Sequence, residues 1–204
     1  MKSNLTKMVL ASAGILLLAS PVLHAAEAGD WVFRVGVGSV DPKSNNGDIV
    51  SVDTGTTLVF NGTYMFNQNV ALEVLAALPF SHDIKLEGTG TKVGEAKQLP
   101  PTVSLQYHFA NDSAFTPYAG LGVNYTLFFD DKAKGPLAGS ALSLDASFGA
   151  AAQLGFDYDL SDNMLVNFDI RWIDIDTDAK LDGVPLETVE IDPFVYSLTV
   201  GWRF

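Results

Sequence analysis

The sequence predicts an all-β protein: an eight-stranded antiparallel transmembrane β-barrel with short periplasmic turns and longer extracellular loops. Segments that alternate apolar and polar residues recur along the chain, with turn-forming residues between them. Hydrophobic residues make up 48% of the chain and mean hydropathy is +0.20. Beyond the N-terminus no segment approaches the ~18 unbroken apolar residues of a membrane helix. A barrel resolves this conflict, because its lipid-facing half replaces the usual solvated surface.

The N-terminus has the pattern of a secretory signal peptide. Two lysines precede an uninterrupted run of apolar and small residues from Met8 to Leu18, which Pro21 ends before the small residue Ala25. We therefore predict residues 1–25 as the signal and residues 26–204 as the outer-membrane barrel. The alternative is an uncleaved anchor, but the apolar run is too short to span a bilayer.

Charge and cysteine content limit the possible partners. The formal net charge is −12, and loss of Lys2 and Lys7 with the signal takes it to −14. Such an acidic chain is not expected to bind nucleic acid. The chain has no cysteine, and an exported barrel needs no disulfide when its backbone hydrogen bonds close on themselves.

The alternating segments predict eight strands, joined in turn by long and short connections. The strands are expected at 31–40, 56–66, 69–78, 101–109, 117–129, 147–158, 164–175 and 192–204. The short joints are 66–69, 110–116 and 159–163, and the long joints are 41–55, 79–100, 130–146 and 176–191. Asn and Asp in the short joints favour turns. Strict alternation of joint length is typical of outer-membrane barrels and places both chain ends in the periplasm.

The last strand shows the alternation most clearly. One side carries Phe194, Tyr196, Leu198, Val200, Trp202 and Phe204, and the other side is mostly small or polar. Aromatic residues gather at strand ends, as in the aromatic belts of membrane interfaces: Trp31, Phe66, Tyr107, Phe109, Tyr158 and Trp202 at one rim, Phe129 and Trp172 towards the other. We expect the terminal Phe204 to act as the assembly signal for the barrel-assembly machinery. The alternative is a soluble β-sandwich, which the scarcity of lysine within the strands disfavours.

The opposite strand faces predict a polar floor in the periplasmic half of the barrel. Its candidate residues are Arg34, Glu73, His108, Asp157, Asp169 and Arg203. Opposite charges at similar depth should pair, because isolated buried charges are costly. The alternative is that these residues are only the polar core of a small barrel, with no role in transport.

Higher in the barrel the inward positions turn apolar or small and predict an apolar pocket. The candidate lining residues are Val59, Leu75, Ala77 and Ile173, with Arg171 nearer the floor. Pro79, Pro100 and Pro101 flank the second long loop. Proline has no N–H to donate to a ladder, so strand pairing should stop there. A gap in the wall at these prolines would let an apolar solute leave sideways into lipid.

No constellation of catalytic residues is evident. His24, His82 and His108 lack metal-ligand spacing, and no nucleophile motif occurs. Ser104 and His108 share a strand face but lie four residues, ~13 Å, apart. We therefore predict no enzyme activity, no metal and no cofactor. An acidic fourth loop allows divalent cations to bridge to lipopolysaccharide, but a solvated acidic loop is the preferred interpretation.

The sequence resembles the OmpW family of outer-membrane proteins, which includes the AlkL-type hydrocarbon uptake proteins. The matching stretches are 26–31 (AEAGDW), 69–80 (NVALEVLAALPF), 99–109 (LPPTVSLQYHF), 117–130 (PYAGLGVNYTLFFD), 164–177 (MLVNFDIRWIDIDT) and 191–204 with its GWRF end. The resemblance implies an eight-stranded barrel whose narrow apolar channel passes small hydrophobic molecules into the membrane through a lateral opening. It also implies that Leu75 narrows the channel and that Arg171 stands where some members place an aromatic constriction residue.

We therefore expect passive uptake of small hydrophobic solutes, with outer-membrane lipid and lipopolysaccharide as surroundings. One alternative is a structural or interaction barrel that presents its loops to a partner or phage. Another is a small pore for polar solutes or ions. A continuous apolar pocket under the loops favours uptake, and a filled lumen favours a structural role.

Overall fold

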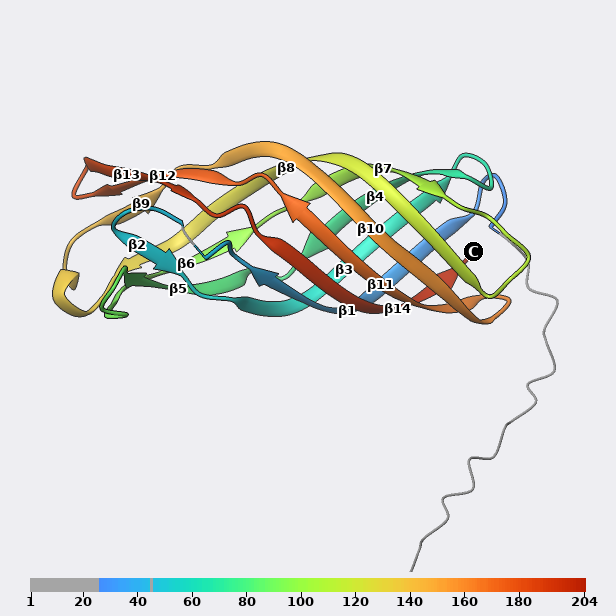
Figure 1. Cartoon of the computed structure of the whole chain (residues 1–204), viewed down its shortest axis with the longest axis horizontal. Helices are drawn as coiled ribbons and strands as arrows, with labels where there is room; N and C mark the ends of the chain where they lie inside the picture. Colours follow the sequence, from blue (N-terminus) through green and yellow to red (C-terminus); the bar gives the residue numbers. More distant parts are fainter. Residues whose placement is uncertain (1–25, 45) are drawn as a thin grey trace, which may run out of the picture.

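Eight long antiparallel strands close into a barrel in the computed structural model, which describes residues 26–44 and 46–204 (Figure 1). These strands are β1 (Trp31–Asp41), β3 (Gly55–Met65), β4 (Val70–Ala77), β7 (Thr102–His108), β8 (Phe115–Ala133), β10 (Ser147–Ser161), β11 (Met164–Ile173) and β14 (Phe194–Arg203). They follow one another around the ring in chain order, and β14 returns to pair with β1. The predicted eight-stranded barrel is confirmed. The expected signal peptide, residues 1–25, lies outside the described residues.

The first and last strands seal the barrel. Val32 pairs with Arg203, and the register continues without a break to Asp41 and Phe194. Beyond the ladder, the Trp31 amide donates to the Phe204 carbonyl at 3.0 Å, and the Phe204 amide donates to the Trp31 carbonyl at 2.8 Å. The C-terminus therefore lies at the end of the barrel that carries the short turns (Figure 1).

Side chains alternate between the outside and the lumen along the long strands. On β14, Phe194 and Tyr196 are 49% and 39% exposed, whereas Val195 and Ser197 are 2% and 5% exposed. The aromatic residues expected at the two rims are likewise exposed on the outer surface. An outer face this apolar belongs in hydrocarbon rather than water. A closed barrel with its apolar side outward excludes the soluble sandwich.

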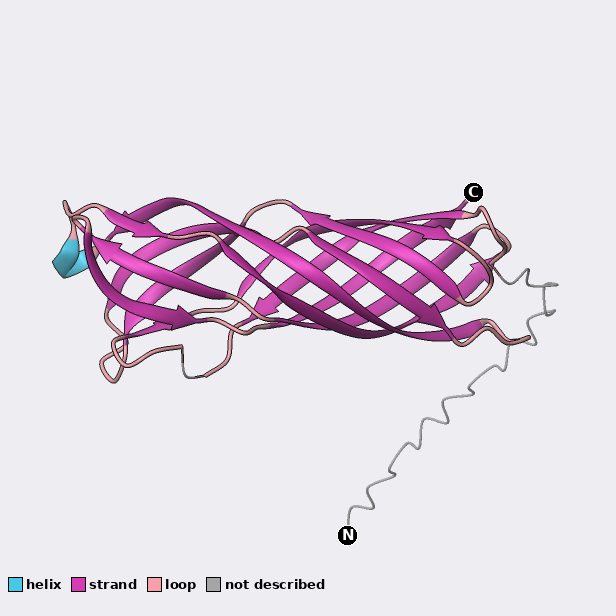
Figure 2. Cartoon of the chain, turned by 90° about the horizontal axis from the view of Figure 1, so that it is seen from above, coloured by secondary structure: helices cyan, strands magenta, loops and turns pink. Residues whose placement is uncertain are grey.

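Six further strands of three to eight residues lengthen the barrel at the other end, in segments that were predicted to be loops. They are β2 (Val50–Val52), β5 (Phe80–Leu86), β6 (Lys92–Leu99), β9 (Leu142–Leu144), β12 (Asp176–Leu181) and β13 (Val184–Glu190). The β5–β6 hairpin pairs with the outer end of β8, and β12 lies between β13 and β9. A 3₁₀ turn, Gly135–Leu137, also lies at this end (Figure 2). We call these six strands and the outer end of β8 the extension.

The outer surface of the extension carries exposed ion pairs, unlike the apolar outer face of the barrel. Lys97 on β6 lies 2.8 Å from Asp130 on β8, and Lys92 lies 2.7 Å from Asp83 on β5. These exposed cross-strand ion pairs mark a surface in contact with water. The extension therefore projects beyond the apolar band of the barrel. Within residues 26–44 and 46–204, no helix has the length and apolarity needed to cross a membrane.

The apolar outer face gives a direct test of the lipid boundary. Leu121 on β8 is 73% exposed, and Leu121→Arg is expected to lower the free energy of unfolding by about 2–4 kcal/mol, because it places a charge in hydrocarbon. Urea unfolding in lipid vesicles measures this loss. Val184→Arg in the extension, at a residue that is 62% exposed, is the matched control and should change stability little. Equal effects of the two variants would contradict the assigned boundary.

Candidate functional site

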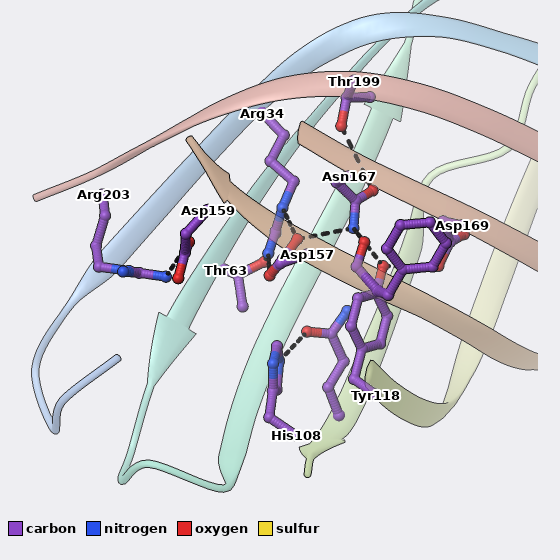
Figure 3. Close-up of polar contacts among 12 residues, drawn as sticks. Arg34, Thr63, His108, Tyr118, Asp157, Asp159, Asn167, Asp169, Thr199 and Arg203 are labelled. Atoms are coloured by element: carbon purple, nitrogen blue, oxygen red, sulfur yellow. Dashed lines mark hydrogen bonds and ion pairs between the residues drawn. The ribbon is translucent and has the colours of Figure 1, made fainter. Parts of the chain in front are cut away.

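Arg34 forms a two-point ion pair across the lumen. Its Nη2 lies 2.7 Å from Asp157 Oδ2, and its Nε donates to Asp157 Oδ1 at 3.2 Å (Figure 3). Its Nη1 donates to Thr63 Oγ1 at 2.7 Å. Both charged side chains are buried, so the cost of removing them from water is offset by paired geometry and by a partner for each guanidinium nitrogen.

Arg171 makes the second ion pair. Its Nη2 donates to Glu73 Oε1 at 2.5 Å and lies 3.5 Å from Asp169 Oδ1. Because β4 and β11 occupy opposite positions in the ring, the contact between Arg171 and Glu73 reaches across the barrel. We call Arg34, Glu73, Asp157, Asp169 and Arg171 the ionic layer.

Tyr118 and Asn167 join the two ion pairs into one network. The Tyr118 hydroxyl donates to Asp169 Oδ2 at 3.0 Å, and Asn167 Nδ2 donates to Tyr118 Oη at 3.0 Å and to Asp157 Oδ1 at 2.9 Å (Figure 3). Gly155 makes room for the tyrosine, because a Cβ at this position would lie 2.5 Å from the phenol. Hydrogen bonds thus link the Arg171–Asp169 side of the ionic layer to the Arg34–Asp157 pair.

The remaining residues expected in the floor lie nearer the short turns. Arg203 contacts Asp159 at 3.2 Å. His108 Nε2 lies 3.0 Å from Gln106 Oε1, and the His108 ring lies 5.0 Å from that of Tyr118. The structure therefore brings four of the six expected floor residues into the ionic layer and places His108 and Arg203 beside it.

The apolar residues expected to line a pocket pack together instead. Val59, Leu75 and Ile173 are 0%, 5% and 0% exposed and belong to one buried cluster, with Ala77 against it. An eight-stranded barrel is only just wide enough for its own side chains, so these residues fill the space between them. We call Val59, Leu75, Ala77 and Ile173 the apolar layer; the same cluster continues outward to Val189 and Ile191. Arg171, expected as a channel residue, belongs to the ionic layer.

An apolar cavity of about 60 Å³ lies further out, inside the extension. Its apolar walls include Val52, Ile84, Val93, Ala96, Leu144 and Val189, and its polar wall residues are His82, Gln98, Thr177 and Glu187. This cavity was not predicted from the sequence, because these wall residues lie in connections that were predicted to be loops. A signal was present, since Phe80, His82 and Ile84 alternate with the polar residues Ser81, Asp83 and Lys85.

The ladder between neighbouring strands is interrupted beside the prolines. Pairing of β4 with β7 ends at Leu75 and Thr102, and pairing resumes between β5 and β6 at Phe80 and Gln98. Pro79, Pro100 and Pro101 lie within the unpaired stretch, where pairing was expected to stop. None of these prolines is among the cavity-lining residues.

His82 is a buried histidine in the cavity wall. Its Nδ1 lies 2.6 Å from the Asp53 carbonyl oxygen, and its Nε2 lies 3.0 Å from Gln98 Nε2. A carbonyl only accepts, so Nδ1 carries the proton and Nε2 accepts from Gln98. Burial lowers the pKa of His82 below its usual 6.5, which keeps the ring neutral near pH 7.

The acidic fourth loop brings three carboxylates together. Asp174, Asp176 and Asp192 have carboxylate oxygens within 4.8 Å of one another. Lys43 lies 3.0 Å from Asp192, whose other oxygen accepts from the Ile175 amide at 3.3 Å. These contacts give Asp192 a structural role in holding the loop.

The closed ring, its apolar outer face and its ionic lumen define a small outer-membrane β-barrel. The OmpW family model matches residues 27–204. The chain is 38% identical to outer membrane protein W of Vibrio cholerae serotype O1, over 94% of this chain and 96% of that protein. It is 32% identical to outer membrane protein AlkL of Ectopseudomonas oleovorans, over 86% and 83% of the two chains. The chain therefore belongs to the OmpW family.

A solved structure shows the same architecture. The crystal structure of the outer membrane protein OprG from Pseudomonas aeruginosa superposes with a TM-score of 0.80 at 36% identity. The match covers 91% of this chain and 99% of OprG. The family resemblance and the outer-membrane location expected from the sequence are confirmed.

Removing one member of an ion pair in the ionic layer should lower the free energy of unfolding more than removing both members. Glu73→Met leaves Asp169, at 3.5 Å, as the acidic partner of Arg171 among residues 26–44 and 46–204. We expect a loss of about 3 kcal/mol in the free energy of unfolding, because a buried charge loses its main partner. The double variant Glu73→Met/Arg171→Met should recover most of this loss. Reversible urea unfolding in vesicles measures both variants, and simple additivity of the two substitutions would refute the coupling.

The His82 assignment has a spectroscopic consequence. Nitrogen-15 NMR of the ring in a pH titration should show the Nδ1–H form persisting below pH 6.5, because the folded-state pKa is lowered by burial. The unfolded chain takes up the proton first as the pH falls, so the contribution of His82 to stability decreases below pH 6.5. An Nε2–H form at pH 7 would show that the assignment is wrong.

Proposed function

We propose that this barrel takes small apolar solutes from outside the cell and releases them sideways into the outer membrane. The observation that carries the proposal is an apolar cavity in the extension, placed above a lumen that the apolar and ionic layers fill. Lipopolysaccharide and water resist an apolar molecule, and a sheltered apolar site lowers that barrier. Transport of this kind is passive and follows the concentration gradient of the solute.

The ionic layer argues against a straight path to the periplasm. An apolar solute passing it would have to separate Arg171 from Glu73, which are each about 1% exposed. Exposing these charges to hydrocarbon without partners is strongly unfavourable. In the proposed route, Val59, Leu75, Ala77 and Ile173 form the constriction, and the solute turns sideways above them.

The interrupted ladder supports a lateral exit. Backbone groups that face lipid need partners, and proline has no N–H group to leave unpaired. Pro79, Pro100 and Pro101 therefore make a wall opening less costly here than elsewhere in the ring. Phe80 and Gln98, each 1% exposed, stand at the edge of the interruption, so exit requires their side chains to move.

A structural or interaction barrel is the second candidate. The filled apolar layer favours it, because the lumen is closed at the height of Leu75 and Ile173. An ion pore is the weaker candidate, and planar-bilayer recordings should show no steady conductance. The uptake experiment below separates the first two candidates.

The decisive measurement is uptake of octane by cells that carry a cytosolic alkane-oxidising enzyme. Cells with the barrel should oxidise octane faster than cells with an empty vector. Pro100→Ala/Pro101→Ala restores two backbone donors and should lower the rate towards that of the vector, because the ladder can close. Pro185→Ala, in the extension hairpin, is the matched control and should retain the full rate.

Folded barrel must be present at equal amounts in the outer membrane of the three strains that express it. Equal rates with and without the barrel would reject uptake and favour the structural role. A proline variant with the full rate would reject exit at the prolines while leaving uptake intact.

A further inference from the structure

We infer that the cavity of the extension selects apolar molecules that carry one hydroxyl group, held by the side-chain carboxamide of Gln98. The inference rests on the proposed function and specifies the chemical class of its solute. It concerns an alkanol or a phenol in place of a plain hydrocarbon, and it places recognition in the extension rather than in the membrane-spanning lumen.

The orientation of the Gln98 carboxamide follows from His82. The Asp53 carbonyl fixes the imidazole proton on Nδ1, so the ring offers Nε2 as an acceptor. Only the NH₂ group of Gln98 can satisfy that acceptor, and its nitrogen lies 3.0 Å away. The amide oxygen of Gln98 must then point away from the ring.

That amide oxygen is left without a partner. Gln98 is 1% exposed and lines the cavity, and its Oε1 makes no hydrogen bond within the described part of the chain. A buried acceptor without a partner is costly, and native structures usually supply one. A hydroxyl group on a bound molecule would supply it.

The other polar residues of the cavity sharpen the choice of ligand. Thr177 already donates its hydroxyl to the Asp145 carbonyl at 2.7 Å. Glu187 Oε2 accepts from the Asp48 amide at 3.0 Å, and its Oε1, also buried, has no partner in residues 26–44 and 46–204. The free positions are thus acceptors, which favour a donor and disfavour a carboxylate.

The position of Gln98 couples recognition to the proposed exit. Gln98 pairs with Phe80 at the first rung above the ladder interruption, two residues before Pro100. A solute moving from the cavity towards the prolines passes this side chain. The same carboxamide therefore contacts a solute before release.

Phenol and toluene test the inference, because they differ only by a hydroxyl in place of a methyl group. Both are larger than the free space of about 60 Å³, so binding of either one requires the cavity walls to move apart. Each is titrated into the barrel in lipid nanodiscs, and binding is followed by the methyl NMR signals of Ile84, Val93 and Leu144. Gln98→Met keeps the side-chain size and removes both the acceptor and the NH₂ donor to His82 Nε2. It is therefore made and compared in a His82→Phe background, so that no freed ring nitrogen can accept from phenol in its place. It should weaken phenol binding about three- to tenfold, the usual net effect of one hydrogen bond, and leave toluene binding unchanged.

Lys97→Met, on the same strand but outside the cavity lining, is the control and should alter neither affinity. Equal weakening of phenol and toluene by Gln98→Met would overturn the inference, because it would reflect shape alone. Unchanged phenol binding, or no shift of the cavity methyl signals, would also overturn it. Octane uptake by Gln98→Met cells separates the two proposals, since full uptake with an overturned inference leaves the proposed function standing.

Discussion

Backbone hydrogen bonding in a medium without water governs the rest of this structure. A strand in hydrocarbon finds partners only on neighbouring strands, so the sheet must return to its own first strand. The β1–β14 seam, with its paired Trp31 and Phe204, completes that ring. Once the ring is closed, successive side chains along each strand point alternately to lipid and into the lumen. The lumen is just wide enough to hold the inward side chains. Where the inward residues are charged, they pair across the lumen and form the ionic layer.

The same constraint makes the exceptions informative. Pairing lapses where the sequence has Pro79, Pro100 and Pro101, residues that have no amide proton to leave unpaired. Beyond the lapse, β5 and β6 pair again and carry charged outer faces, so the wall continues in water. The barrel thus has a membrane part and a solvated part, and the apolar cavity belongs to the second.

Period-two alternation was sufficient to predict the eight barrel strands, because every second residue of such a strand faces lipid and is almost always apolar. The strand predicted at 117–129 is β8, Phe115–Ala133, which starts two residues earlier and ends four residues later, within the extension. The extension strands were missed because their outer faces are charged, as in His82–Leu86, which resembles a polar loop. Sequence also indicated that inward charges pair, but the choice of Asp157 for Arg34 and Glu73 for Arg171 depends on strand stagger, which alternation does not specify.

The span of the ionic layer bears on how many copies a cell can hold. Arg171 and Glu73 meet from opposite strands, and Tyr118 and Asn167 tie them to the Arg34–Asp157 pair. The two guanidinium groups and three carboxylates of the layer are buried and form ion pairs with one another, and in the proposed route no solute passes them. A barrel that works in this way would add no leak of ions or polar metabolites to the envelope, so its abundance would not be limited as that of a wide porin is.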